Sequence, residues 1–550
     1  MYNVIDELQS LCVRLGLVIN ETKTKYQSRA VNGKEFWMNG IRLEKVTSYK
    51  YLGMYVSFCN NVKDQIAHVK NICTARLKPL KVLSNRGNGV GVPVLRSIYL
   101  STVRSIIDYS APVLASYSEK NLRPLEVIQN EGMRIVLGCP RTTRIEIMRL
   151  ELNIPSVFNR IWELTAISAL RLIRRGDDQL KSAVDNYRTS GNRNFKMNAY
   201  TKRICNKFLE YNVIDFCLPV TQSDPLEPWL MSNVCVRIDK LDVKKKDCYP
   251  YELRQIFCEK ISKYPMENVI HMYCDGSVSG NKAGCGVIIR EFFEFGISVE
   301  ERLCKRISDR SSCITAELYA IYMGLNYAVE KKKTIFGFVD CQSALFALNT
   351  KTPAADDLVQ KCRKCIYDIK SLGCDVSFMW IPSHCDIYFN EIADDLAKQG
   401  CEKDTIECDC SLSIKQIKSE VVKVRKQWEW DNARMILRNG SKSMKHYDIV
   451  MNNTNFSYGK AAAKYDVFMM RLRFGYKYFW EYGEGTDGIP CKLCGAISSH
   501  TLYHYIMECN GLDEYRCDGI TNLTEMVCYM INNNVVKKIM NKFTKFDIRF

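Results

Sequence analysis

The sequence lacks any uncharged apolar run near the roughly 20 residues that a membrane-spanning helix needs. Its beginning, Met1 to Glu7, provides neither the basic nor the apolar stretch of a secretory signal. Low-complexity tracts and clear internal repeats are also absent. These absences predict a soluble intracellular protein, nuclear or cytoplasmic and not secreted, with no membrane partner.

Neither composition nor length fits a disordered chain or a single small domain. A content of 47% hydrophobic and 25% charged residues is typical of globular proteins, and 550 residues exceed what one core usually supports. Lys and Arg outnumber Asp and Glu by 78 to 61, which suits a partner with a phosphate backbone, although a basic protein without such a partner has the same composition. The 26 cysteines are scattered through apolar patterns and predict reduced thiols.

We expect four segments along the chain. Residues 1–165 alternate short strand-like and long helical patterns, and residues 166–265 form a helical connector that becomes polar and irregular. A compact α/β pattern occupies residues 266–403. Residues 404–550 are helical, basic and aromatic, and contain a Cys/His cluster at 491–509.

Acidic residues stand at the ends of predicted elements in the α/β segment. The strand-like run 269–274 ends at Asp275, and the later run 335–339 ends at Asp340. Between them, an amphipathic helix carries Glu317 at the margin of its apolar face. A carboxylate at the end of a buried strand stands on a rigid scaffold and faces an open edge.

A fourth carboxylate lies on a later helix. The strand 376–381 leads through His384 into a helix that begins at Asn390 and bears Asp394 off its apolar face. Any one of these acids alone is more simply a helix cap or a surface charge. Four that converge would repel one another unless cations neutralise them, and Mg²⁺ prefers hard oxygen ligands. Two such ions about 4 Å apart can support phosphodiester cleavage.

The acids also stand within short motifs that follow one another in a fixed order. These are Asp275-Gly276-Ser277 with Gly280-Asn281 and Gly284, then Ala316-Glu317-Leu318, Asp340 with Gln342-Ser343, and His384 with Asn390-Glu391, Asp394 and Leu396-Ala397. In this combination the segment resembles the ribonuclease H type 1 family across its full length. The resemblance implies an α/β fold with an RNase H-like five-stranded mixed sheet flanked by helices, between mainly helical N- and C-terminal domains.

The resemblance implies an endonuclease that hydrolyses the RNA strand of RNA–DNA hybrids, leaves 5′-phosphates and uses two Mg²⁺ ions, or Mn²⁺ in their place. It implies that Asp275 bridges both ions and that Asp394 serves the ion that activates water. Glu317 and Asp340 would serve the leaving-group ion, and His384 would assist proton transfer or product release. The substrate-binding residues implied are Gly276, Asn281, Gln342 and Asn390.

Two features depart from the family pattern. Cys313 and Ile314 occupy a stretch where many members carry asparagines just before the catalytic glutamate, so those amides are missing for contacts to 2′-hydroxyls. Asp340 and Asp394 are only 54 residues apart, which leaves no room for the basic handle helix of some members. We therefore expect the flanking domains to grip nucleic acid.

The first segment contains motifs of another kind. They are Leu15 to Lys25, Tyr49 to Gly53, Leu100-Ser101 with Arg104-Ser105 and Asp108-Tyr109, Leu125 with Ile128-Gln129-Asn130, and Leu152-Asn153-Ile154-Pro155. These resemble the downstream palm and thumb of non-LTR retrotransposon reverse transcriptases. The paired aspartates of that polymerase do not occur in residues 1–14, so no polymerase activity is expected from this chain. It looks like the downstream part of a longer polyprotein, or a truncated gene model of one.

The Cys/His cluster near the end predicts a zinc site. Cys491 and Cys494 are separated by two residues, and His504 and Cys509 follow, as in tetrahedral structural Zn²⁺ sites. Because the chain is rich in cysteine, a chance pair of buried thiols is the alternative. His500 is a rival third ligand. We prefer His504 because the His-x4-Cys ending resembles the zinc-binding tail found after the nuclease in such elements.

Other interpretations remain open. Basic and aromatic residues interleave at 471–475 and 428–430, as in single-strand binders, but an amphipathic helix that packs its aromatics gives the same pattern. The leading hypothesis is a nuclease on RNA–DNA hybrids. The alternative is a catalytically silent, nucleic-acid-binding retroelement remnant. A transposase or integrase of related fold is disfavoured by the ending Asn390 to Ala397.

Overall fold

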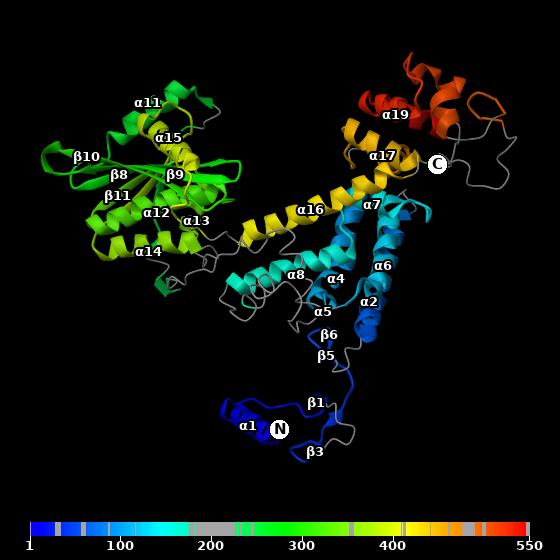
Figure 1. Cartoon of the computed structure of the whole chain (residues 1–550), viewed down its shortest axis with the longest axis horizontal. Helices are drawn as coiled ribbons and strands as arrows, with labels where there is room; N and C mark the ends of the chain where they lie inside the picture. The colour runs from blue at the N-terminus through cyan, green and yellow to red at the C-terminus, as the bar shows by residue number, and fades with distance from the viewer. Residues whose placement is uncertain are drawn as a thin grey trace. The chain divides into compact units, whose positions relative to one another are not determined.

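The computed structural model contains two compact units, each with its own core (Figure 1). It describes residues 2–27, 35–56, 62–85, 89–115, 117–174, 182, 226–227, 229–230, 234–241, 243, 247–350, 357–408, 410, 414–440, 442–459, 462–475, 490–497 and 502–545. Among these, unit 1 comprises the residues up to Thr165 and those from Arg425 onward, and unit 2 comprises the residues between them. None of the described helices is both long enough and apolar enough to cross a lipid bilayer.

A six-stranded mixed sheet forms the centre of unit 2 (Figure 1). Its strands are β7 (Arg237–Asp239), β8 (Val269–Ser279), β9 (Lys282–Phe292), β10 (Ser298–Ile307), β11 (Thr334–Val339) and β12 (Val376–Trp380), in the order β10-β9-β8-β11-β12-β7. Strands β8, β9 and β10 form an antiparallel meander, whereas β11, β12 and β7 run parallel to β8. The expected α/β fold class is confirmed, with one strand more than the predicted five.

Helices cover both faces of this sheet. They are α12 (Cys313–Lys331), α13 (Gln342–Asn349) and α14 (Asp357–Ser371) on one face, and α11 (Pro250–Ile261) and α15 (Tyr388–Glu402) on the other. Alternation along β8 explains the two layers, because successive side chains of a strand point to opposite faces. Met272 and Cys274 belong to the core under α12, and Tyr273 belongs to the core under α11.

The sixth strand comes from the predicted connector. Residues of β7 pair in parallel with β12 and cover that edge of the sheet. Val234 and Val236 are buried in the same core as the sheet, and Phe257 of α11 packs edge-on against Phe338 with ring centroids 5.9 Å apart. The body that contains the sheet therefore begins well upstream of residue 266.

Unit 1 is mainly helical. Its α-helices are α1 (Tyr2–Arg14), α2 (Val62–Ser84), α3 (Val92–Ile98), α4 (Ser105–Tyr109), α5 (Ala111–Leu114), α6 (Glu119–Leu137), α7 (Ile145–Leu152), half of α8 (Val157–Arg174), most of α16 (Ile414–Arg438), α17 (Lys442–Asn453), α18 (Ala463–Arg473), α19 (Leu523–Asn532) and α20 (Val536–Lys545). One core joins the two ends of the sequence, because Met444 and Tyr447 pack in the same cluster as Tyr99 and Leu125.

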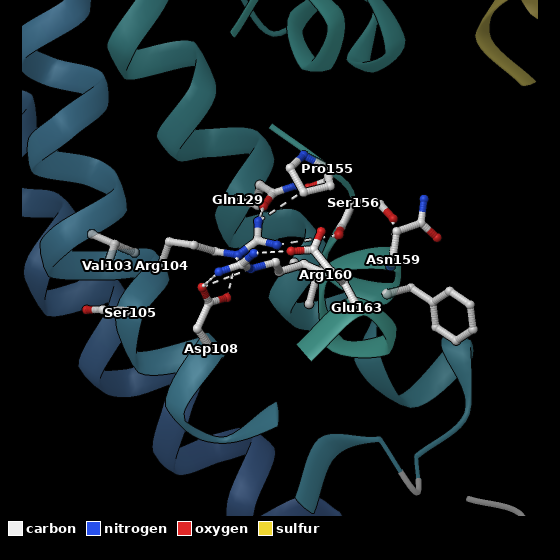
Figure 2. A network of polar contacts seen from close by, with 12 residues as sticks. Val103, Arg104, Ser105, Asp108, Gln129, Pro155, Ser156, Asn159, Arg160 and Glu163 are labelled. Carbon is white, nitrogen blue, oxygen red and sulfur yellow. Dashed lines mark hydrogen bonds and ion pairs between the residues drawn. The ribbon is translucent and has the colours of Figure 1, made fainter. Parts of the chain in front are cut away.

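Buried charges fasten α16 to α8 within unit 1. Figure 2 shows the guanidinium groups of Arg104 and Arg160 next to each other at Asp108, which accepts hydrogen bonds from both. Arg160 also pairs with Glu163, whose other oxygen accepts from Arg425 Nε of α16 at 2.6 Å. The side chains of Glu163 and Arg425 are 2% and 7% exposed. Removing one partner would leave a buried charge without full compensation, so this contact is sensitive to substitution.

A second buried pair joins α7 to α18. Arg473 Nε donates to Glu151 Oε1 at 2.9 Å, and the side chains are 7% and 3% exposed. Tyr447 donates its hydroxyl hydrogen to the other oxygen of Glu151 at 2.8 Å. Within unit 1, the helical residues 145–165 and 425–473 are thus held together by both apolar and ionic contacts.

Candidate active site and metal centre

Four carboxylates from four elements converge at one end of the sheet in unit 2. Asp275 lies within β8, Glu317 lies in the first turns of α12, Asp340 directly follows β11, and Asp394 lies on α15. Asp275, Glu317 and Asp340 each offer an oxygen, and these oxygens lie within 4.8 Å of one another. Asp394 is within hydrogen-bonding reach of Asp275. The structure therefore brings together all four acids that the motifs pointed to.

Glycines in the strands permit this convergence. A Cβ atom on Gly276 would lie 2.3 Å from the backbone nitrogen of Glu317, so a larger residue would push α12 away from β8. A Cβ atom on Gly286 would lie 2.3 Å from the carbonyl oxygen of Ala393 on α15. Close backbone packing against β8 and β9 thus fixes the helices that carry Glu317 and Asp394.

The electrostatics of the cluster favour a bound cation. Burial, followed by the negative charges of Asp340 and Asp394, raises the pKa of Asp275 to about 7. Burial and the charges of Asp275 and Asp340 raise the pKa of Glu317 well above its ordinary value. Glu317 Oε2 is buried and accepts no hydrogen bond from the described residues. Buried oxygen ligands of this kind suit a hard divalent cation such as Mg²⁺, so the residues present fit the predicted ions.

A cleft of about 270 Å³ opens at the carboxylates. Its lining consists of Asp275, Gly276, Ser277, Val278, Cys313, Asp340, His384, Asn390, Glu391 and Asp394. Glu317 does not line the cleft and is 6% exposed, so it lies behind the other acids. A substrate phosphate that entered the cleft would face oxygen ligands on several sides.

The loop before α15 adds a second group of donors. His384, Glu391 and Asp394 each offer one ligand atom within 4.8 Å of the others. His384 is exposed and has a φ of 54°, a left-handed conformation that is uncommon for residues other than glycine. Such backbone strain often accompanies functional loops. The predicted site residue His384 is therefore in the cleft, beside Asp394.

The predicted substrate-binding residues divide into two pairs. Gly276 and Asn390 line the cleft, and Asn390 is 3% exposed with an Oδ1 atom that accepts no hydrogen bond from the described residues. Asn281 and Gln342 are exposed and do not line it. Asn281 lies in the turn between β8 and β9, and Gln342 is the first residue of α13. The structure does not bring these two into the cleft.

Several residues at this site were assigned no role from the sequence, among them Cys313, Glu391 and Lys398. Cys313 and Glu391 line the cleft, and Lys398 Nζ lies 2.7 Å from Asp394 Oδ2. The signal for Glu391 and Lys398 was their spacing from Asp394 on one helix, since residues three or four apart are neighbours there. Such pairs are common on helix surfaces, and the spacing alone therefore did not single them out.

The predicted zinc ligands also converge. Cys491, Cys494, His504 and Cys509 each offer one donor atom within 4.8 Å of the others. The Sγ atoms of Cys491 and Cys509 are 3.8 Å apart, and Cys494 Sγ lies 3.6 Å from His504 Nε2. Zn–S bonds of about 2.3 Å and Zn–N bonds of about 2.0 Å give tetrahedral edges of about 3.8 and 3.5 Å. The donor set therefore fits Zn²⁺.

The surroundings of the cluster support this fit. His504 Nδ1 lies 3.5 Å from Glu508 Oε2, an arrangement that leaves Nε2 for a metal. Burial and the negative charge of Cys491 raise the pKa of Cys509 to about 12, so a cation is needed if both thiols are to be ionised together. The rival ligand His500 lies outside the described residues.

The basic and aromatic stretch near residue 473 is packed inside unit 1. Phe474 is 3% exposed, and Arg473 is engaged with Glu151. These contacts agree with the alternative of a packed amphipathic helix. Trp428 and Trp430 are half-buried.

Comparison with known proteins places the α/β part of the chain in a family. Residues 267–402 match the family model described as RNase H. A probable RNA-directed DNA polymerase from transposon BS of Drosophila melanogaster is 25% identical over 137 residues. That match covers 25% of this chain and 15% of the relative. Residues 267–402 are therefore an RNase H domain, which confirms the resemblance seen in the motifs, and a curated relative is a transposon reverse transcriptase.

Parts of the chain also match solved structures, RNase H domains among them. LC11-RNase H1, isolated from compost by a metagenomic approach, is 21% identical and the match covers 24% of this chain and 96% of that one, with a TM-score of 0.20. The RNase H domain of prototype foamy virus is 17% identical, with coverages of 25% and 96% and a TM-score of 0.21. The protease-reverse transcriptase of prototype foamy virus is 19% identical, with coverages of 26% and 22% and a TM-score of 0.22.

Proposed function

We propose that the RNase H domain hydrolyses the RNA strand of RNA–DNA hybrids with two divalent cations, Mg²⁺ or Mn²⁺, as part of a retrotransposon-derived protein. The observation that carries this proposal is the meeting of Asp275, Glu317 and Asp340 within 4.8 Å, with Asp394 beside them. The family match at residues 267–402 supports the same reaction class.

Each carboxylate has a place in this proposal. Asp275, which lies between the other acids, would hold both cations. Asp394 would hold the cation on the side of α15, and Glu317 with Asp340 the other. Bound divalent cations would supply an ionised water and neutralise charge on the leaving oxygen. Burial of Glu317 limits the water that competes for the same oxygens.

The cleft residues would orient the substrate and handle protons. Hydrolysis breaks the bond between phosphorus and the 3′ oxygen and leaves a 5′-phosphate, so the leaving oxygen must gain a proton. His384 is exposed at the cleft and close to Asp394, so it would exchange protons with solvent or assist release of the product. Gly276 and Asn390 would contact nucleic acid in the cleft, and Asn281 and Gln342 would contact it outside. We expect the protein to act inside the cell, in the nucleus or the cytoplasm, where its cysteines stay reduced.

A structural Zn²⁺ is the second part of the proposal. Cys491, Cys494, His504 and Cys509 would hold it, and the thiols Cys491 and Cys509 lie in the same core as α18, α19 and α20. Its contribution would be to stability rather than to the cleft, because both thiols are buried in unit 1.

Cleavage assays with labelled nucleic acids test the nuclease. Full-length protein is incubated with an RNA–DNA hybrid, duplex DNA or duplex RNA, with Mg²⁺ or EDTA. We expect cutting of the hybrid alone, with Mg²⁺ alone. Asp340→Asn should abolish cutting because it removes a cation ligand. Asp368→Asn is the matched control, since Asp368 lies on α14 of the same unit and does not line the cleft.

Each other outcome supports a different function. Hybrid binding without cutting would support the silent nucleic-acid-binding remnant. Cutting of duplex DNA would support the transposase or integrase alternative. Wild-type cutting by Asp340→Asn, or cutting in EDTA, would overturn the assignment of the carboxylates.

A further inference from the structure

The carboxylate cluster has a cation of its own within the chain. Lys398 lies one helical turn after Asp394 on α15, and its Nζ atom is 2.7 Å from Asp394 Oδ2. The same Nζ atom is 3.9 Å from Asp395 Oδ1. The Lys398 side chain is 56% exposed, whereas that of Asp394 is 15% exposed. The ammonium group therefore reaches a mostly buried ligand from the solvent side.

This contact places Lys398 in competition with a divalent cation. A cation held by Asp394 needs the lone pairs of its carboxylate, and one oxygen already accepts the ammonium. A positive charge at this distance also opposes the approach of a second one. Lys398 has an alternative partner in Asp395, which is 70% exposed, so the side chain can leave Asp394 without losing every acidic neighbour.

We propose that Lys398 is an exchangeable counter-ion of Asp394 that raises the divalent-cation concentration the nuclease needs. Before the cation binds, Lys398 offsets part of the repulsion among the four acids. When the cation binds, Lys398 gives up Asp394 Oδ2 and turns toward Asp395. The inference rests on the proposed function, because it concerns the cations of that same site.

The matched control is another lysine pair on unit 2. Lys364 on α14 pairs with Asp368 four residues later, at 3.2 Å, and its side chain is 52% exposed. In this pair, as in that of Lys398 with Asp394, the two residues are four positions apart and the lysine is about half exposed. Neither Lys364 nor Asp368 lines the cleft. Removing the charge of Lys364 reports the general effect of one lysine fewer on the surface.

Direct measurement of cation binding tests the inference without the reaction. The full-length protein, saturated with Zn²⁺, is titrated with Mn²⁺, and free Mn²⁺ is followed by electron paramagnetic resonance. Lys398→Met should lower the dissociation constant by roughly two- to fivefold, the factor that a partly exposed ion pair represents. Lys398→Arg, which keeps the charge, and Lys364→Met should both bind as the wild type does.

The outcomes separate this inference from the proposed function. If Lys398→Met binds Mn²⁺ no more tightly than the wild type, the counter-ion role is wrong and the nuclease proposal stands. The same conclusion follows if Lys364→Met gains as much affinity for Mn²⁺ as Lys398→Met does. If the wild type binds no Mn²⁺ that Asp275→Asn removes, the proposed cation site is wrong, and the inference fails with it.

Discussion

Asp275→Asn should stabilise the protein in the absence of divalent cations while it abolishes cutting. Asp275 is 9% exposed and stands among other carboxylates, which together with burial raise its pKa from 3.8 to about 7. In the unfolded chain the group ionises near its ordinary pKa. Above pH 7 the folded state therefore holds an ionised group that it disfavours, at a cost of up to roughly 4 kcal/mol, from 1.36 kcal/mol per pKa unit. Asparagine removes this cost.

The sign of the pH dependence follows from the raised pKa. Below pH 3.8 the carboxyl is protonated in both states, so wild type and Asp275→Asn should be equally stable apart from packing. The amount by which the free energy of unfolding of Asp275→Asn exceeds that of the wild type should grow between pH 4 and pH 7 and then level off. Mg²⁺ should reduce it, because a cation bound to the native state stabilises the wild type.

Unfolding of the full chain in EDTA, followed from pH 4.5 to pH 8 by scanning fluorimetry, measures this difference. Asp368→Asn serves as the control, because Asp368 lies on α14 away from the cleft and its removal should not stabilise the protein. The electrostatic explanation of the cluster would be wrong if Asp275→Asn were less stable than the wild type at pH 8. It would also be wrong if Asp275→Asn changed the unfolding temperature by the same amount at every pH.

Three further predictions concern the rest of the chain. Arg425→Met should lower the free energy of unfolding of unit 1, measured in urea, by about 2–3 kcal/mol. The loss stays below the largest values for buried ion pairs because Arg160 still pairs with Glu163. Adding Glu163→Gln to Arg425→Met should recover part of the loss. A fragment that begins at residue 267 lacks β7, so its β12 edge should be exposed and the fragment should aggregate, as measured by light scattering. A fragment that begins at residue 226 retains β7 and should stay monodisperse. Cys491→Ser should lower the zinc content measured by mass spectrometry and leave hybrid cutting intact, and a loss of cutting equal to that of Asp275→Asn would contradict the separation of the two sites.

Much of the RNase H fold could be predicted because its elements have strong local signals. The apolar runs before Asp275 and Asp340 are strong local signals of strands. The strand β11 ends directly before Asp340 as expected, whereas β8 continues past Asp275 to Ser279. Both acids could be expected to converge at one edge of a mixed sheet, and the structure adds that β8 and β11 pair in parallel. The strand β7 has only three residues within a polar stretch, and its burial depends on a partner about 140 residues later, so no local pattern indicated it.

The joining of the two chain ends in unit 1 also had no local signal. Glu163 and Arg425 are separated by 262 residues, and each reads in the sequence as an ordinary charge on an amphipathic helix. Their burial arises because α8 and α16 pack together, which periodicity cannot specify. The same reason applies to Asn281 and Gln342, whose distance from the cleft depends on the geometry of a turn and of a helix start.

Four acids at one sheet edge should share a pair of divalent cations. Anomalous diffraction from crystals of the full-length protein soaked in Mn²⁺ locates these cations. We expect two peaks about 4 Å apart, one on each side of Asp275, with Asp394 bound to one and both Glu317 and Asp340 bound to the other. Crystals with no peak at Asp275, or with one of the four carboxylates turned away from both peaks, would show that the proposed cation site is wrong.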